Sequence, residues 1–318
     1  MARLLVTGGV GFIGYHVTRA LLARGDDVLV ADDFSDRPYP REEKLRNEVD
    51  LRAEFPGVRV VRACVTDRKA MAPLVGEAEA VLHLAGLAGV RPSFGDPVRY
   101  VRVNVEGTAV VQELAREHGL ERFLLASSSS VYGNATALPA AEDAPAVVPE
   151  SPYAASKRGA ELVASSICRN APAMRCTALR FFTVYGPRQR PEMAITRFMR
   201  AAVAGQPITL FGEGTMRRDF THIDDIVRGV IAALDAKGAP GFQVYNLGSG
   251  APVDLRSLVE AISATVGARL RIETGPVPLG DVDATFADIS RARQELGWAP
   301  RMTLREGLST VLAWVREP

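Results

Sequence analysis

Apolar residues in the first 182 positions fall into short runs that are separated by amphipathic or loop segments. The runs read RLLVT, DVLVA, VRVVRA, AVLHLA, RFLLAS and RCTALRF. Short, nearly uncharged runs are typical of strands that are covered on both faces, and their alternation with helical patterns indicates a parallel sheet. The pattern therefore predicts a doubly wound parallel α/β sheet. Its helices are expected at 11–24, 42–53, 67–75, 97–117 and 153–169.

The regular alternation stops after Thr183. The later apolar patterns predict helices near 193–204, 223–236, 254–266 and 303–315, and the run FQVYNL reads as one more strand that can join the sheet. We therefore expect one sheet domain and a smaller C-terminal lobe. The sheet domain covers 1–182 together with about 220–250, and the lobe covers 183–219 together with about 251–318.

Composition narrows the class of protein further. The chain has 318 residues, and its 38 basic and 37 acidic residues give a formal net charge of +1, so no overall field attracts nucleic acid or an anionic membrane. Cys64, Cys168 and Cys176 lack metal-binding spacing and read as free thiols, so no metal site is expected. No stretch reads as a signal peptide or membrane helix. These features predict a soluble cytoplasmic protein.

A glycine-rich turn directly follows the first predicted strand. In VTGGVGFIG, Gly8, Gly11 and Gly14 lie between that strand and a helix, where they allow a tight turn and close approach of a pyrophosphate to backbone N–H groups. Asp32 ends the second strand at the distance expected of a carboxylate that binds the adenosine ribose. Its charge repels a 2′-phosphate, so the pattern predicts a Rossmann domain that binds NAD rather than NADP.

Tyr153 and Lys157 are four residues apart at the start of a predicted helix and therefore share one helical face. A nearby ammonium and an oxidised nicotinamide both favour the phenolate, so we expect the tyrosine pKa, ordinarily about 10, to fall toward neutrality. Tyr153 would then serve as a base. The run SSSS ends a strand just upstream, where ligands of doubly wound sheets bind.

In this order, the glycine turn, Asp32, the serine run and the YxxxK pair resemble the extended short-chain dehydrogenase/reductase family, which includes nucleotide-sugar epimerases and dehydratases. The resemblance extends over essentially the whole chain. It implies that Tyr153 is the general base, that Lys157 binds the nicotinamide ribose and lowers the tyrosine pKa, and that Ser128 orients the sugar hydroxyl. The residues implied in NAD binding are Gly8, Gly11, Phe12, Ile13, Gly14, Asp32, Asp33, Phe34, Cys64, Val65, Leu84, Ala85, Gly86, Tyr153 and Lys157.

Three positions depart from the family pattern. Cys64 stands where an aspartate usually binds the adenine amino group, and a thiol is a weak acceptor, so we expect weaker anchoring of adenine there. Arg188 and Gln189 replace a usual Trp-Gly pair. His83, in the strand before Gly86, is expected to be a buried core residue rather than a catalyst.

The sugar-side residues resemble those of UDP-glucuronate 4-epimerases. Ser129 and Ser130 stand where dehydratases and decarboxylases of the family carry carboxylates, which leaves epimerisation at C4. The segment LRFFTVYGPRQRPEMA is similar to the run RFFTVYGP followed by GRPDMA in those epimerases. The resemblance implies that UDP-sugar is bound by Ser129, Ser130, Thr183, Arg190, Thr209, Phe211, Arg218 and Asp281.

Four alternatives stay open at this point. A UDP-glucose/UDP-galactose 4-epimerase would use the same chemistry on a neutral sugar, and a UDP-glucuronate decarboxylase would lose the carboxylate. A non-catalytic NAD sensor would keep the fold without turnover, and a reductase would consume its coenzyme. The resemblance also implies a homodimer, formed through the helices near 97–117 and 153–169.

Overall fold

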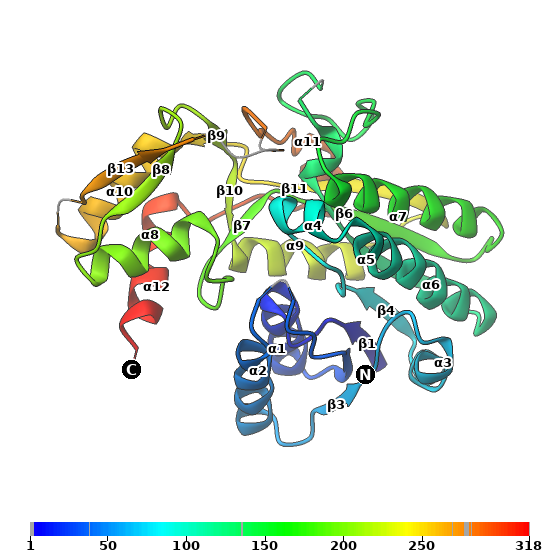
Figure 1. Ribbon diagram of the computed structural model, residues 1–318. Helices are drawn as coiled ribbons and strands as arrows, with labels where there is room; N and C mark the ends of the chain where they lie inside the picture. The colour runs from blue at the N-terminus through cyan, green and yellow to red at the C-terminus, as the bar shows by residue number, and fades with distance from the viewer. Residues whose placement is uncertain are drawn as a thin grey trace.

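The computed structural model describes residues 3–37, 39–134, 136–268, 270–276, 280 and 282–317. A seven-stranded sheet lies at its centre in the order β11-β6-β5-β4-β1-β2-β3, with every pairing parallel (Figure 1). Its strands are β1 (Arg3–Thr7), β2 (Asp27–Asp32), β3 (Arg59–Arg62), β4 (Ala80–His83), β5 (Arg122–Ser128), β6 (Arg175–Phe181) and β11 (Gly241–Leu247). The predicted doubly wound parallel sheet is confirmed.

Helices cover both faces of this sheet. On one face lie α1 (Phe12–Arg24), α2 (Arg41–Glu54), α9 (Ile223–Asp235) and α11 (Ser290–Leu296). On the other lie α3 (Arg68–Gly76), α6 (Gly107–Glu117) and α7 (Pro152–Arg169). The short helices α4 (Val90–Gly95) and α5 (Pro97–Val101) and a π-helical turn (Arg102–Glu106) precede α6, so the helix expected at 97–117 is a composite.

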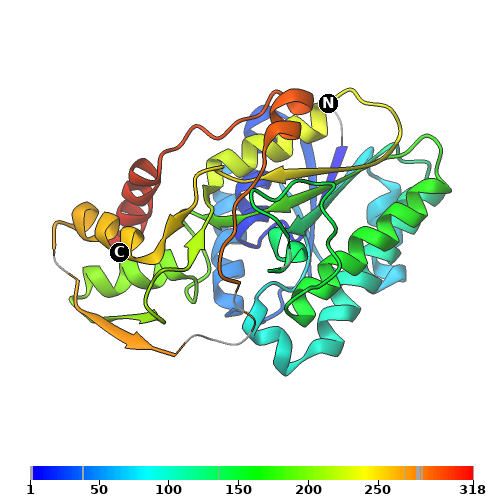
Figure 2. The ribbon, with the colours of Figure 1, turned by 90° about the horizontal axis from the view of Figure 1, so that it is seen from above.

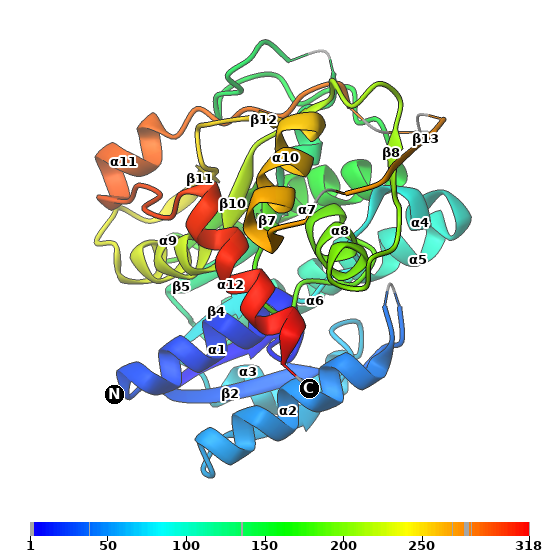
Figure 3. The ribbon, with the colours of Figure 1, turned by 90° about the vertical axis from the view of Figure 1, so that its left-hand side faces the viewer.

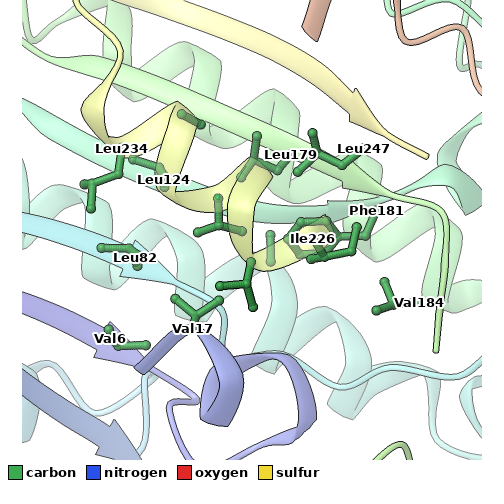
Figure 4. Packing of buried hydrophobic residues seen from close by; sticks show 14 of the residues in the cluster. Val6, Val17, Leu82, Leu124, Leu179, Phe181, Val184, Ile226, Leu234 and Leu247 are labelled. Carbon is green, nitrogen blue, oxygen red and sulfur yellow. The ribbon is translucent and has the colours of Figure 1, made fainter. Parts of the chain in front are cut away.

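Alternation along the strands explains why both faces are filled. On β1, Leu4 and Val6 face the α1 and α9 side, whereas Leu5 faces the α3, α6 and α7 side. Figure 4 shows this packing: Val6 from the sheet lies near Val17 of α1, with Ile226 of α9 above them. A strand buried on both faces is apolar at most of its positions, which is why the apolar runs are nearly continuous.

The remaining elements form a lobe beside the sheet (left in Figure 2). A separate core cluster holds this lobe together. Its helices are α8 (Ala194–Val203), α10 (Leu255–Val266) and α12 (Leu304–Arg316), close to the predicted positions, and α12 begins with a capping box of Thr303 and Glu306. Its strands are β7 (Thr183–Tyr185), β8 (Ile208–Phe211), β9 (Arg217–Arg218), β10 (Phe220–His222), β12 (Val253–Asp254) and β13 (Ile272–Gly275).

Two features of the chain path matter for the site. The strand β11 returns from the later part of the chain and pairs with β6, as the run FQVYNL predicted. The strand order reverses between β1 and β4, whose carboxyl ends pair at Thr7 and His83. In doubly wound sheets, ligands bind in the crevice at such a reversal. The helices α4 and α11 were not predicted, because each spans less than two turns of periodic sequence.

Candidate functional site

A cavity of about 500 Å³ opens at the reversal point and extends toward the lobe. Most of the residues expected to bind cofactor or substrate contribute to its wall. These are Gly8, Gly11, Phe12, Ile13, Gly14, Asp32, Asp33, Val65, Leu84, Ala85, Gly86, Ser128, Ser129, Ser130, Tyr153, Thr183, Arg190, Phe211 and Arg218. Phe34, Cys64, Lys157 and Thr209 lie off this wall, and Asp281 lies outside the described residues.

The glycine turn is packed as tightly as its sequence suggests. Gly8 has φ +70, and a Cβ there would lie 2.7 Å from the backbone N of Ala85. A Cβ on Gly14 would lie 2.0 Å from the carbonyl oxygen of Gly8. No side chain fits at either position, so the start of α1 lies directly against the ends of β1 and β4.

Asp32 ends β2 with its side chain buried. Its Oδ1 accepts a hydrogen bond from the backbone N of Phe34 at 2.9 Å and lies 3.0 Å from Nζ of Lys44. Lys44 also lies 3.5 Å from the Asp33 carboxylate. Sequence reasoning missed Lys44 and Tyr39, both of which line the cavity beside Asp32. A lysine in the first turns of the helix after the acidic loop was the available signal.

Tyr153 lies in the first turn of α7, where the sequence starts the helix firmly. Pro152 occupies a position that needs no N–H donor, and the Ser151 hydroxyl accepts from the backbone N of Ala154 at 3.1 Å. One turn later, Lys157 is buried and its Nζ donates to the carbonyl oxygen of Ala126 at 3.0 Å. A Cβ on Gly86 would lie 2.9 Å from this Nζ, so Lys157 lies directly behind the cavity wall.

The protein's own groups do not lower the Tyr153 pKa, and its depression beside bound NAD⁺ stays a prediction. Burial raises the pKa of Tyr153 above its ordinary value, and a hydrogen bond with Ser128 and the charge of Arg190 oppose that rise without cancelling it. Burial also lowers the pKa of Lys157 to about 8. Tyr153 further packs edge-on against Tyr100, with ring centroids 6.2 Å apart. The phenol is therefore neutral at pH 7 until a further positive charge comes close.

Glu161 continues the same helical face one turn beyond Lys157. It is fully buried. Its carboxylate accepts hydrogen bonds from Nε and Nη2 of Arg180, each at 2.9 Å, and from the Ser127 hydroxyl at 2.6 Å. Its charge raises the pKa of Lys157, against the larger effect of burial. Sequence reasoning missed this network, although a glutamate at i+4 from Lys157 was visible.

Arginines and hydroxyls line the end of the cavity toward the lobe. The Arg190 side chain is 13% exposed, and its Nη1 donates to the carbonyl oxygen of Ala88 at 3.3 Å and lies 3.0 Å from Glu192. The guanidinium of Arg91 lies 4.6 Å from the ring centroid of Phe211, and that of Arg197 lies 5.2 Å from it. Sequence reasoning missed both of these arginines. Arginine suits phosphate oxygens and stacks on flat rings.

The described part of the chain holds neither a metal-binding cluster nor a membrane-spanning helix. No group of three or more His, Cys, Asp or Glu side chains there can hold a metal ion. No helix there is long and apolar enough to cross a membrane. His83 is buried, as expected, with Nδ1 2.9 Å from the Thr7 hydroxyl.

Comparison with known proteins agrees with this geometry. Residues 4–248 match the model of the NAD dependent epimerase/dehydratase family. The chain belongs to this family. A UDP-glucuronate 4-epimerase of Thermodesulfobacterium geofontis is 37% identical, over 100% of this chain and 97% of the relative.

Solved structures of family members are similar throughout. The UDP-glucuronic acid 4-epimerase of Bacillus cereus, in complex with UDP-glucuronic acid and NAD, has a TM-score of 0.91 and 32% identity, covering 99% of both chains. The UDP-glucose 4-epimerase of Thermotoga maritima, with UDP-glucose, has a TM-score of 0.87 and 28% identity, covering 99% of this chain and 98% of the other.

Proposed function

We propose that this protein is an NAD-dependent epimerase that converts UDP-glucuronate to UDP-galacturonate at C4 through a transient 4-keto sugar. The observation that carries the proposal is the position of Tyr153 and Ser128, which meet on the cavity wall at the end of β5 while Ser129 and Ser130, without a carboxylate, continue the wall. The similarity to UDP-glucuronate 4-epimerases over the whole chain length supports the choice of sugar.

The residues present fit NAD. The glycine turn packs the start of α1 closely against the ends of β1 and β4, and Gly8, Gly11 and Gly14 line the cavity there, which suits a pyrophosphate at the first amides of α1. The Asp32 carboxylate is held on the cavity wall by the Phe34 amide and Lys44, where it can accept ribose hydroxyls. When bound, NAD⁺ supplies a hydride acceptor for C4 of the sugar and returns the same hydride.

The side chains of this protein handle the proton and the orientation of the sugar. Bound NAD⁺ would supply the further positive charge that favours the Tyr153 phenolate, and in that form Tyr153 takes the proton of the C4 hydroxyl and later returns it, with Ser128 as its hydrogen-bond partner. Lys157 lies one helical turn after Tyr153, and its Nζ donates to the Ala126 carbonyl. Its ammonium therefore adds positive charge behind the reacting centre. Arginines at the lobe end, including Arg218, hold the nucleotide diphosphate while the sugar turns.

A 4-keto sugar with a C5 carboxylate is prone to lose CO₂ when the breaking bond aligns with the carbonyl π system. The side chains of Ser129, Ser130 and Thr183 are on the wall and can hold the carboxylate out of that alignment by hydrogen bonding. Arg190 is close enough for its charge to act on Tyr153 and is a second group suited to an anionic sugar. These contacts favour epimerisation over decarboxylation.

The decisive experiment incubates the purified protein with NAD⁺ and UDP-glucuronate and resolves UDP-galacturonate, UDP-pentose and unchanged substrate. UDP-glucose, tested in parallel, decides between the acidic and the neutral sugar, which the similarity to the T. maritima enzyme keeps in view. Turnover of UDP-glucose alone would overturn the choice of sugar. No turnover of either, with NAD bound, would point to a non-catalytic NAD-binding protein.

We also propose that the protein forms a homodimer through the face made by α5, the following π-helical turn and α7. The described residues on this face include the large apolar side chains of Val98, Val101 and Leu162, which are 74%, 52% and 55% exposed. A contiguous apolar helix face is typical of an interface between copies. The described lining residues of the cavity all come from one chain.

A further inference from the structure

Arg188 has an unusual backbone conformation for a residue with a side chain. Its φ is +65, in the left-handed region that favours glycine. Such a conformation persists where the surrounding contacts over-determine it, and it often occurs near functional sites. Arg188 lies in the segment between β7 and α8, here called the 186–193 loop, two residues before Arg190.

The Arg188 side chain is bound to two helices of the sheet domain. Its Nη1 donates to Oδ1 of Asn47 at 2.7 Å, and its Nη2 donates to Oδ2 of Asp50 at 2.6 Å, both on α2. The guanidinium also lies 4.3 Å from the ring centroid of Tyr15 on α1. Figure 3 shows α1 and α2 together on the side of the sheet domain. Charge-assisted hydrogen bonds and a cation–π contact thus act on one side chain.

The contacts of Arg188 connect it to the glycine turn through Asn47. Asn47 is buried, and its Nδ2 donates to the carbonyl oxygen of Val10, inside the turn, at 2.9 Å. The carbonyl oxygen of Pro187 lies 3.0 Å from Nε2 of His16 on α1. Because a carbonyl can only accept, His16 donates this hydrogen bond from Nε2. The loop is therefore attached at two successive residues to the half of the molecule that carries the cofactor turn.

The other end of the loop lines the cavity. Gln189 is buried, donates from Nε2 to the Val184 carbonyl at 2.7 Å and accepts from the Thr196 hydroxyl at 2.8 Å. The next residue is Arg190, whose carbonyl accepts from the backbone N of Met193 at 3.1 Å. Only Gln189 separates Arg188 from Arg190, and its buried side chain leaves little room for the backbone between them to absorb a shift.

We propose that Arg188 is a positioning residue that clamps the 186–193 loop to α1 and α2 and thereby sets the guanidinium of Arg190 for the substrate. The clamp joins the glycine turn, through Asn47, to the substrate end of the cavity. The catalytic part of this inference rests on the proposed function, whereas the clamp itself does not. Arg188 does not line the cavity and acts through Arg190.

The clamp is tested by amide hydrogen exchange on the NAD-loaded protein. The variants are Arg188→Ala, Arg188→Gly, which makes the positive φ free of strain, and the control Arg46→Ala on α2, whose side chain is 73% exposed. We expect the Gln189 and Met193 amides to lose about tenfold protection in both Arg188 variants and none in the control. Wild-type protection in Arg188→Gly would overturn the proposal, because the side chain would then be dispensable.

The link to Arg190 is tested by a double-mutant cycle on steady-state kinetics with UDP-glucuronate. Arg188→Ala should raise KM about tenfold and change kcat much less, and it should add less than about twofold in an Arg190→Ala background. Additive effects would overturn the positioning role. If the wild type turns over neither UDP-glucuronate nor UDP-glucose, the proposed function fails, and the exchange experiment still decides whether the clamp exists.

Discussion

The Tyr153 hydroxyl carries the proposed proton transfer, so its removal has a specific expected result. Tyr153→Phe keeps the ring packing against Tyr100 and removes only the oxygen. We expect kcat to fall about 10³-fold, in the range typical of losing a general base, while UDP-sugar affinity changes little. Product analysis and calorimetric binding measure the two quantities. Turnover close to that of the wild type would assign the proton transfer to another group.

Thr183 and Ser130 control the fate of the keto intermediate in our proposal. In a Ser130→Ala/Thr183→Ala variant, the sugar carboxylate loses hydroxyl partners on the cavity wall. We expect the fraction of UDP-pentose among the products to rise several-fold, because the carboxylate is freer to align with the ketone. Chromatographic separation of the products measures that fraction. The idea is wrong if the product mixture stays unchanged.

We expect His83 to make the free energy of unfolding depend on pH. Burial lowers the His83 pKa from its ordinary 6.5 to about 3, so the folded protein holds it neutral while the unfolded chain takes up a proton. Stability therefore falls as the pH drops through the window between about 6.5 and 3, by about 1.4 kcal/mol per pH unit for this group. Denaturant titrations at several pH values should show a shallower slope for His83→Gln.

The matched control for this prediction is His118→Gln, because His118 is exposed. Its replacement should leave the slope of stability against pH as it is in the wild type. If both variants keep the wild-type slope, the acid sensitivity belongs to other groups and not to His83; His16, whose pKa burial lowers to about 4, is one of them.

The helix α7 depends on a buried ion pair for its position against β6. Glu161→Gln removes the negative charge to which Nε of Arg180 donates at 2.9 Å and leaves a buried guanidinium without its counter-charge. We expect the free energy of unfolding to fall by about 3 kcal/mol, as for other buried pairs broken on one side. Urea titration measures this loss. Arg158→Ala, which removes a partly exposed partner of the same carboxylate, should cost less than about 1 kcal/mol.

Elements whose signals are local could be predicted from the sequence, and those set by distant contacts could not. The strand runs, the glycine turn and the Tyr153–Lys157 spacing are each complete within a short segment. Lys44 and Arg188 gain their roles only when α2 packs beside other segments, which no local pattern encodes. The rise that burial causes in the Tyr153 pKa could not be predicted for the same reason, because depth of burial is a property of the packed chain.

The assembly of two copies is the prediction for the complete protein. Val98→Glu/Leu162→Glu would place charges on the apolar face of α5 and α7. We expect this variant to sediment as a monomer, because burying unpaired carboxylates is costly, whereas the wild type sediments as a dimer. Val147→Glu changes an equally exposed apolar residue in the 137–152 loop and should leave the dimer intact. A monomeric wild type would refute the proposed interface.

The return of β11 to the sheet has a consequence for any attempt to divide this protein. A fragment that stops after Phe182 would lose the strand Gly241–Leu247 and uncover the whole length of β6, a row of backbone donors and acceptors beside apolar side chains. Bare edges of that kind recruit other chains. The amino-terminal half is thus not a portable nucleotide-binding module. Truncation would yield aggregates instead of a smaller protein that still binds its coenzyme.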